Sequence, residues 1–143
     1  MIYENETFTL EKSAECPIPG YLVLRMKGEM TGLAQLPAEA ARALGEMLAR
    51  VAKAIEDVVE AERVYVLSFC EVDRRLHFHL FPRTDWLLKR YWKANGEKSG
   101  AVNGPLLFEW ARKTIVNARD LPAGVPGPAA ASASIRARLE RSA

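Results

Sequence analysis

Two strand-like segments joined by a very short connection constrain the fold of this chain most strongly. Residues 63–69 read Arg-Val-Tyr-Val-Leu-Ser-Phe, and such β-branched and aromatic residues favour a strand. Residues 75–82 read Arg-Leu-His-Phe-His-Leu-Phe-Pro and alternate with the period of two that is typical of a strand. A parallel crossover needs about a dozen residues or more, and residues 71–74 are too few to make one. The two segments are therefore predicted to pair antiparallel.

A long amphipathic helix is predicted over residues 37–59. Pro37 suits the first helical position, where its missing amide donor is not needed. Apolar residues recur at steps of three and four and form one stripe, which consists of Leu44, Met47, Leu48, Val51, Ile55, Val58 and Val59. This stripe predicts a helix that packs one face against the rest of the protein.

The remaining elements complete an α+β pattern. Residues 7–11 alternate between polar and apolar side chains, which is typical of a half-buried strand. Residues 16–20 contain two prolines that break regular structure, and residues 21–26 then indicate a buried strand. Residues 105–117 favour a second amphipathic helix. We expect an antiparallel sheet of about five strands with one long central helix and a second, C-terminal helix.

The C-terminal third is less regular in pattern. Residues 89–93 interleave basic and aromatic side chains, which favours a strand with a solvated basic face over a surface that binds a polyphosphate or a base. Residues 121–131 contain three prolines and two glycines and are expected to be extended. Residues 132–141 predict a short basic helix that needs a docking partner. One domain is therefore expected over residues 1–120, followed by a linker and basic tail over residues 121–143.

Charge and composition exclude several classes of protein. Residues 132–143 hold three Arg and one Glu, which leaves 17 basic and 17 acidic residues in the rest of the chain. A neutral body argues against a dedicated nucleic-acid binder, which usually carries a basic face. No apolar run approaches the roughly 18 residues needed to cross a bilayer, and the polar N-terminus is unlike a signal peptide. Two cysteines are too few for a disulfide scaffold. We therefore expect a cytoplasmic protein that binds neither membranes nor nucleic acids.

Both histidines of the chain, His77 and His79, point to the same side of one predicted strand. Side chains at this spacing lie about 6.6 to 7 Å apart and can meet one small ligand. Three interpretations stay open. The two can be ordinary polar residues, or metal ligands that would need Cys70, Glu71 or Asp73 as a third ligand. In the third interpretation one imidazole is a nucleophile toward phosphorus and the other stabilises the charge that develops.

The stretch Arg-Leu-His-Phe-His-Leu-Phe-Pro-Arg over residues 75–83 resembles the signature of the histidine triad (HIT) family. In that family three histidines alternate with apolar residues and are often followed by Pro-Arg. Residues 17–24, Pro-Ile-Pro-Gly-Tyr-Leu-Val-Leu, resemble the Pro-Gly-His entry of a family strand. The predicted long helix and the strand over residues 64–69 also fall where the family places them. The resemblance covers roughly residues 3–84.

The resemblance implies a nucleotide-binding fold, a homodimer whose sheets join edge to edge, and no obligatory metal or other cofactor. It also implies hydrolysis or transfer at the α-phosphate of a nucleotide ester, anhydride or phosphoramidate, with purines favoured. By position His77 is the nucleophile that forms a nucleotidyl-histidine, and His79 is the third triad histidine. Arg75, Ser68 and Arg83 are the candidate phosphate-binding residues, and a guanidinium matches that group well. A surface ion pair is the alternative for Arg83, and a tolerated small residue on the strand is the alternative for Ser68.

The chain also departs from the family pattern. Arg75 replaces the first triad histidine, and Tyr21 replaces a histidine that often follows Pro-Gly. Ser13 stands where members often place a ribose-binding Asn or Asp. The glycine-rich phosphate segment is replaced by the shorter residues 70–74. These departures leave two alternatives beside the hydrolase or transferase: a nucleotide-binding or regulatory module with weak catalysis, and a metal-dependent enzyme that uses His77 and His79 as ligands.

Overall fold

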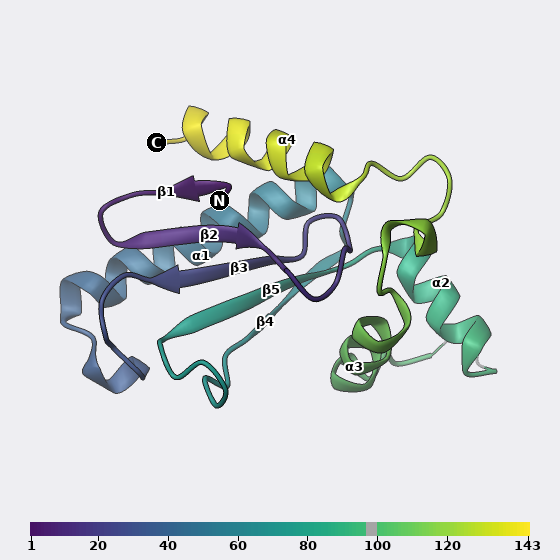
Figure 1. Ribbon diagram of the computed structural model, residues 1–143, viewed down its shortest axis with the longest axis horizontal. Helices are drawn as coiled ribbons and strands as arrows, with labels where there is room; N and C mark the ends of the chain where they lie inside the picture. Colours follow the sequence, from purple (N-terminus) through teal and green to yellow (C-terminus); the bar gives the residue numbers. More distant parts are fainter. Residues whose placement is uncertain (97–99) are drawn as a thin grey trace.

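The computed structural model describes residues 1–96 and 100–143 and contains a five-stranded sheet in the order β1-β2-β3-β5-β4 (Figure 1). The strands are β1 (Tyr3–Glu4), β2 (Phe8–Lys12), β3 (Leu22–Met26), β4 (Arg63–Leu67) and β5 (His77–Arg83). All neighbouring strands pair antiparallel. The predicted pairing of the segments around residues 63–69 and 75–82 is confirmed, with Leu67 opposite His79 and Val66 opposite Leu80.

Within the described residues four α-helices accompany the sheet: α1 (Ala38–Val59), α2 (Asp85–Ala94), α3 (Gly104–Thr114) and α4 (Pro128–Arg141). The predicted long helix is α1, which begins after Pro37 and ends at Glu60 in the left-handed conformation. Among the described residues, no helix is long and apolar enough to span a bilayer. The α+β class, the five strands and the long central helix are therefore as the sequence predicts.

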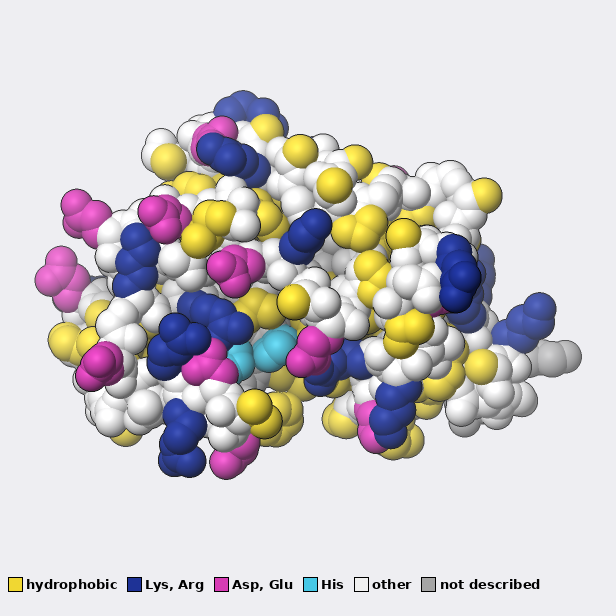
Figure 2. All heavy atoms as spheres, viewed as in Figure 1, with side chains coloured by type: hydrophobic (Ala, Val, Ile, Leu, Met, Phe, Trp, Pro, Cys, Tyr) yellow, Lys and Arg dark blue, Asp and Glu magenta, His cyan; other side chains and the backbone are white. Residues whose placement is uncertain are grey.

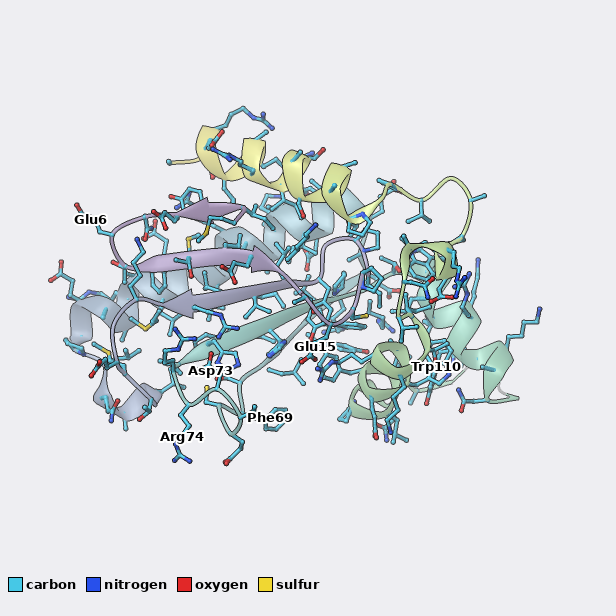
Figure 3. All side chains as sticks on the ribbon, viewed as in Figure 1. Glu6, Glu15, Phe69, Asp73, Arg74 and Trp110 are labelled. Carbon is cyan, nitrogen blue, oxygen red and sulfur yellow. The ribbon has the colours of Figure 1, made fainter. Side chains whose placement is uncertain are left out.

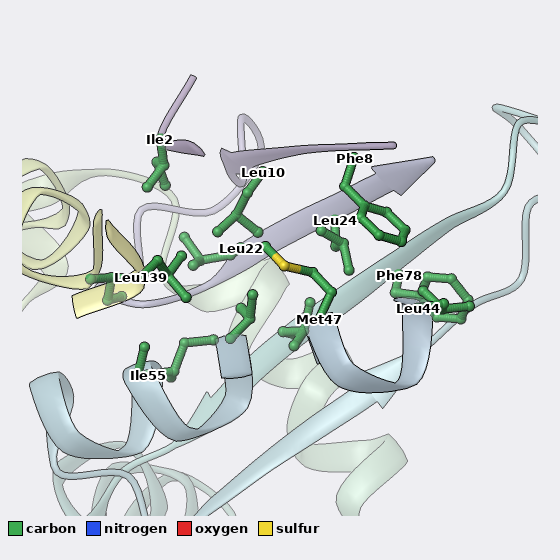
Figure 4. Close-up of a cluster of buried hydrophobic side chains, with 14 of the residues drawn as sticks. Ile2, Phe8, Leu10, Leu22, Leu24, Leu44, Met47, Ile55, Phe78 and Leu139 are labelled. Carbon is green, nitrogen blue, oxygen red and sulfur yellow. The ribbon is translucent and has the colours of Figure 1, made fainter. Parts of the chain in front are cut away.

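The main core lies between the sheet and α1 (Figure 4). Leu24 of β3 and Leu80 of β5 are fully buried there against Val51 and Ile55 of α1. Successive side chains of a strand point to opposite faces of the sheet. His77 and His79 of β5 therefore point to the face away from this core. Full burial of each large apolar side chain contributes about 1.5–3 kcal/mol to folding, so this layer is a major source of the stability of the fold.

A second core holds α2 and α3 against the opposite face of the sheet, at one end of the molecule (Figure 1). Phe81 of β5 is fully buried between Tyr21 and Phe108, with ring centroids 5.2 and 5.1 Å away. Because these helices cover the end of β5 that carries Phe81, the end that carries His77 lies beyond the second core. This partial cover creates the room in which a ligand can approach the histidines.

Two local predictions in the C-terminal third are wrong. Residues 89–93 were expected to form a strand, but they belong to helix α2. Leu87, Leu88 and Tyr91 are buried on one side of it, a helical spacing that the interleaved basic and aromatic residues conceal. Residues 128–131 were expected to be extended, but α4 begins at Pro128, because proline fits the first turn of a helix.

The C-terminal helix finds its docking partner on α1. Ala131, Ile135 and Leu139 of α4 are almost fully buried, and the last two belong to the main core. Figure 4 shows Leu139 in this core. Their spacing of four residues places them on one side of the helix. The expected basic tail thus packs against α1 as a layer outside the sheet.

Candidate active site

A cavity of about 300 Å³ lies in front of the two histidines, on the face of the sheet opposite the main core. Strand β5 supplies His77 and His79, strand β3 supplies Arg25, and helix α3 supplies Arg112. Residues 69–73 form a further wall. Figure 2 shows the histidines in a recess bordered by basic and acidic side chains, and Figure 3 labels Glu15 and Asp73 on either side of it. The cavity size suits a small-molecule ligand.

The local sequence accounts for this arrangement. His77 and His79 point the same way because they are two residues apart on β5, and their ring centroids lie 5.3 Å apart. Arg25 pairs directly with His77 across β3 and β5, so its side chain projects from the same face. The position of Arg112 depends instead on the docking of α3 through the second core.

His77 is almost fully buried and has a defined tautomer. Its Nδ1 atom lies 2.7 Å from the backbone carbonyl oxygen of Arg75, and a carbonyl can act only as an acceptor. Nδ1 therefore carries the proton and donates it, which leaves Nε2 of the neutral ring with a free lone pair. The Cys70 Sγ atom lies 3.7 Å from the same Nδ1. A neutral imidazole held in this tautomer is suited to act as a nucleophile or base through Nε2.

His79 is held in its neutral form. Burial is the main cause that lowers the pKa of His79 to about 4, and electrostatic effects from the neighbouring His77 and from the Arg112 guanidinium add to it. Its Nδ1 atom lies 2.8 Å from the hydroxyl oxygen of Tyr21. Burial raises the pKa of Tyr21 to about 12, so this group remains a hydroxyl near neutral pH. Tyr21 stands where the HIT family pattern often has a histidine. It thus contacts a histidine of the site directly.

Two carboxylates engage the arginines around the cavity. Asp73 accepts hydrogen bonds from Arg25 Nη1 at 2.7 Å and from Arg75 Nε and Nη2 at 3.0 and 2.8 Å. The hydrogen bonds from Arg75 hold the pKa of Asp73 well below its usual range. On the other side Glu15 pairs with Arg112, whose guanidinium also lies over the ring of Phe108. The charges facing the cavity are therefore nearly balanced.

The three predicted binding residues lie in different places. The Arg75 side chain is 62 % exposed and turned to Asp73, while Arg25 occupies the cavity wall. The Ser68 hydroxyl donates to the backbone carbonyl of His77 at 2.7 Å and so supports the strand that carries both histidines. Arg83 lies six residues from His77 along β5, about 20 Å away, in a separate cavity beside Glu62. The structure thus brings Arg75 and Ser68 near His77 and leaves Arg83 remote.

Sequence reasoning missed Arg25 and Arg112 as residues of the site. Arg25 had a usable signal, because it is a charged residue in an otherwise apolar strand, and its register with His77 makes it a cavity residue. Arg112 had no comparable signal, since helix α3 reaches the cavity only through tertiary packing. Both residues become apparent once the sheet order and the docking of α3 are known.

The metal interpretation lacks a donor set in the described part of the chain. There, no three His, Cys, Asp or Glu side chains are grouped closely enough to hold a metal ion. Asp73, one of the residues considered as a third ligand, is engaged by Arg25 and Arg75.

Comparison with known proteins identifies the fold. No family model matches the sequence, and no curated protein matches it significantly. Among solved structures, it is similar to a HIT-like protein involved in cell-cycle regulation from Bartonella henselae, with a TM-score of 0.56 and 19% identity over 96% of this chain and 84% of that one. It is also similar to a hypothetical histidine triad nucleotide-binding protein from Sulfolobus tokodaii, with a TM-score of 0.56 and 18% identity over 98% and 83%.

A Zn-bound histidine triad family protein from Mycobacterium smegmatis gives a TM-score of 0.57 and 17% identity over 99% of this chain and 86% of that chain. Such low identities establish the fold and leave the function to the residues of the site. The chain therefore has the HIT-like α+β fold, and the similarity extends beyond the segment that resembled the family in sequence, because it includes the C-terminal helices.

His79 should make the stability of the protein depend on pH. Because its pKa is about 4 in the folded state and ordinarily 6.5, the unfolded chain takes up this proton first as the pH falls. The corresponding stability is present above pH 6.5 and is lost as the pH falls toward 4, with an expected loss of about 2 kcal/mol after allowance for partial solvent screening. Urea denaturation across this range should show a shallower pH dependence for His79→Asn than for the wild type. Identical dependences would contradict the assignment.

Proposed function

We propose that the protein is a nucleotidyl hydrolase or transferase in which His77 attacks the α-phosphorus of a nucleotide ester, anhydride or phosphoramidate. The defined tautomer of His77 carries this proposal, because Nδ1 donates to the Arg75 carbonyl and Nε2 retains its lone pair. A bond forms between Nε2 and phosphorus while the bond from phosphorus to the leaving group breaks. Water or another acceptor then attacks the nucleotidyl-histidine, which releases the nucleotide and restores the imidazole.

Arg25 and Arg112 are the groups that bind the phosphate in this proposal. Guanidinium groups suit phosphoryl oxygens, and the two side chains line the cavity from opposite elements, β3 and α3. Their carboxylate partners, Asp73 and Glu15, keep them oriented before substrate arrives. Substrate binding would shift hydrogen bonds from these carboxylates to the phosphoryl group, where charge must be stabilised in the transition state.

His79 acts as a hydrogen-bond donor in the same proposal, and Tyr21 positions it. With the Tyr21 hydroxyl donating to Nδ1, the proton of the neutral His79 ring lies on Nε2. That N–H can donate a hydrogen bond to a phosphoryl oxygen or to the leaving-group atom, and it stabilises the negative charge that develops there. The two histidines would thus work as opposite tautomers, one offering a lone pair and the other a hydrogen-bond donor.

Replacing Tyr21 by Phe should lower turnover by about tenfold, because His79 then loses the hydrogen bond that sets its tautomer. Nucleotide affinity should change less than turnover. Nitrogen-15 spectra of the imidazole rings should show an Nε2-protonated His79 in the wild type and mixed tautomers in the variant. Tyr65→Phe is the matched control, because it removes a hydroxyl near Gly104 and away from the site. Unchanged tautomers in Tyr21→Phe would remove the positioning role.

The finer features of the proposal follow the resemblance to the HIT family. We propose a purine nucleotide as the substrate, action in the cytoplasm, and a homodimer formed at the edge of the sheet. Strand β4 is the longer of the two edge strands, and Val66 on it and Phe69 beyond it are exposed apolar residues. Edge strands with exposed apolar side chains are suited to pairing with a second copy. Sedimentation analysis would test the dimer.

A nucleotide-binding or regulatory module with weak catalysis is the second candidate. It is favoured by the pairing of both cavity arginines with carboxylates and by the short segment in place of a glycine-rich phosphate loop. The deciding experiment incubates the wild-type protein with adenosine phosphoramidate and diadenosine polyphosphates, and measures AMP binding by calorimetry. Release of AMP supports the enzyme. Binding of AMP without turnover selects the module, and neither activity would contradict both.

A further inference from the structure

We propose that the groove between α1 and α4 is a second binding site, which takes a small organic phosphate with an apolar body. The groove has a volume of about 440 Å³, compared with about 300 Å³ for the cavity at the histidines. It lies on the helical layer, across the sheet from the histidine face, so the two sites are separate. Figure 1 shows α4 lying beside α1, at a distance from α2 and α3.

The charge of the groove is strongly unbalanced. Arg50 and Lys53 of α1 and Arg138 and Arg141 of α4 line it, together with the single carboxylate of Asp57. Asp57 is shared, because it lies 3.2 Å from Lys53 Nζ and 3.3 Å from Arg138 Nη1. This excess of positive charge contrasts with the near neutrality of the chain as a whole and of the histidine cavity.

Part of this charge lacks partners within the described parts of the chain. Arg141 forms no ion pair there, and the Nε atom of Arg50 is buried without a hydrogen-bond partner. Arg50 Nη2 does have a structural role, since it donates to the Leu139 carbonyl at 2.9 Å and holds the end of α4 in place. Because Lys53 and Arg138 share the one carboxylate of Asp57, these two residues and Arg141 together leave an excess of positive charge for a ligand at the rim.

The wall of the groove indicates which anion would bind. Ala49, Ala54 and Leu139 contribute apolar surface between the charged side chains. An inorganic anion would use the charges alone, whereas an organic phosphate would also cover the apolar wall. Guanidinium groups favour phosphate because their paired donors match its oxygens. The volume suits a small molecule of roughly nucleotide size.

The test uses 1-naphthyl phosphate as the probe, because it joins one phosphate to an apolar ring system. Amide NMR signals of the wild-type protein should shift upon titration at residues 49–57 and 138–142. Inorganic phosphate should bind the same residues more weakly. Shifts confined to the residues around His77, or no shifts at millimolar probe, would overturn the proposal. Binding to phosphatidic acid vesicles without binding of the free probe would also overturn it.

Matched double variants separate a site from general attraction. The Lys53→Gln/Arg141→Gln variant removes two groove charges from exposed positions and should weaken probe binding by about tenfold. The Arg42→Gln/Arg136→Gln variant removes the same charge from the same two helices outside the groove, and should change binding by less than about twofold. If both variants bound the probe equally weakly, the net charge of the protein would explain the loss of affinity, and the proposal would be overturned. Turnover at the histidine site should be unchanged in either variant.

Discussion

Replacing His77 by Asn should reduce release of nucleoside monophosphate by about 10⁴-fold or more, because it removes the proposed nucleophile. The Asn amide can still donate to the Arg75 carbonyl that holds Nδ1 of His77, so the local structure should persist. Nucleotide affinity should fall far less than turnover. Rapid quenching with a substrate labelled at the α-phosphate should trap a covalent adduct on the wild-type protein and none on the variant.

His79→Asn is the matched control for this experiment. It changes the neighbouring imidazole in the same cavity, and it should lower turnover by about 10²- to 10³-fold while a covalent adduct still forms on His77. If His77→Asn retained an adduct, or lost less activity than His79→Asn, the assignment of the nucleophile would be wrong. The scaffold would remain, since neither substitution touches the main core.

Replacing Phe81 by Ala should lower the free energy of unfolding by about 3–5 kcal/mol. Phe81 is fully buried and packs against the rings of Tyr21, Tyr65 and Phe108, so its loss leaves a cavity that several elements line. Urea denaturation measures the change. Turnover should fall as well, because Phe108 anchors the helix that carries Arg112 into the candidate active site.

Phe69→Ala is the control for stability, since Phe69 is 75% exposed and the same ring is removed. Its free energy of unfolding should change by less than about 0.5 kcal/mol. A loss of similar size in both variants would contradict the view that Phe81 connects the sheet to α2 and α3. A small loss in both would indicate that the second core can close around the missing ring.

The local sequence pattern was sufficient to predict each structural feature that depends only on residues close together in the chain. The alternation over residues 75–82 places His77 and His79 on one face, and the short connection before it requires the antiparallel pair that β4 and β5 form. The apolar stripe of α1 likewise follows from its period. Residues 89–93 show where this reasoning fails, because aromatic and basic residues there fit a strand or a helix until α2 packs against its neighbours.

The sequence by itself determined the α+β class, the long helix, the antiparallel hairpin and the shared face of the two histidines, because each follows from backbone periodicity and connection length. Only the tertiary structure decided that β3 lies beside β5, that Arg25 and Arg112 flank the cavity, and that Arg75 turns to Asp73. It also set the hydrogen bonds of His77 and His79 through the Arg75 carbonyl and the Tyr21 hydroxyl. These features join residues far apart in the chain or depend on the path of the folded backbone, and packing determines them.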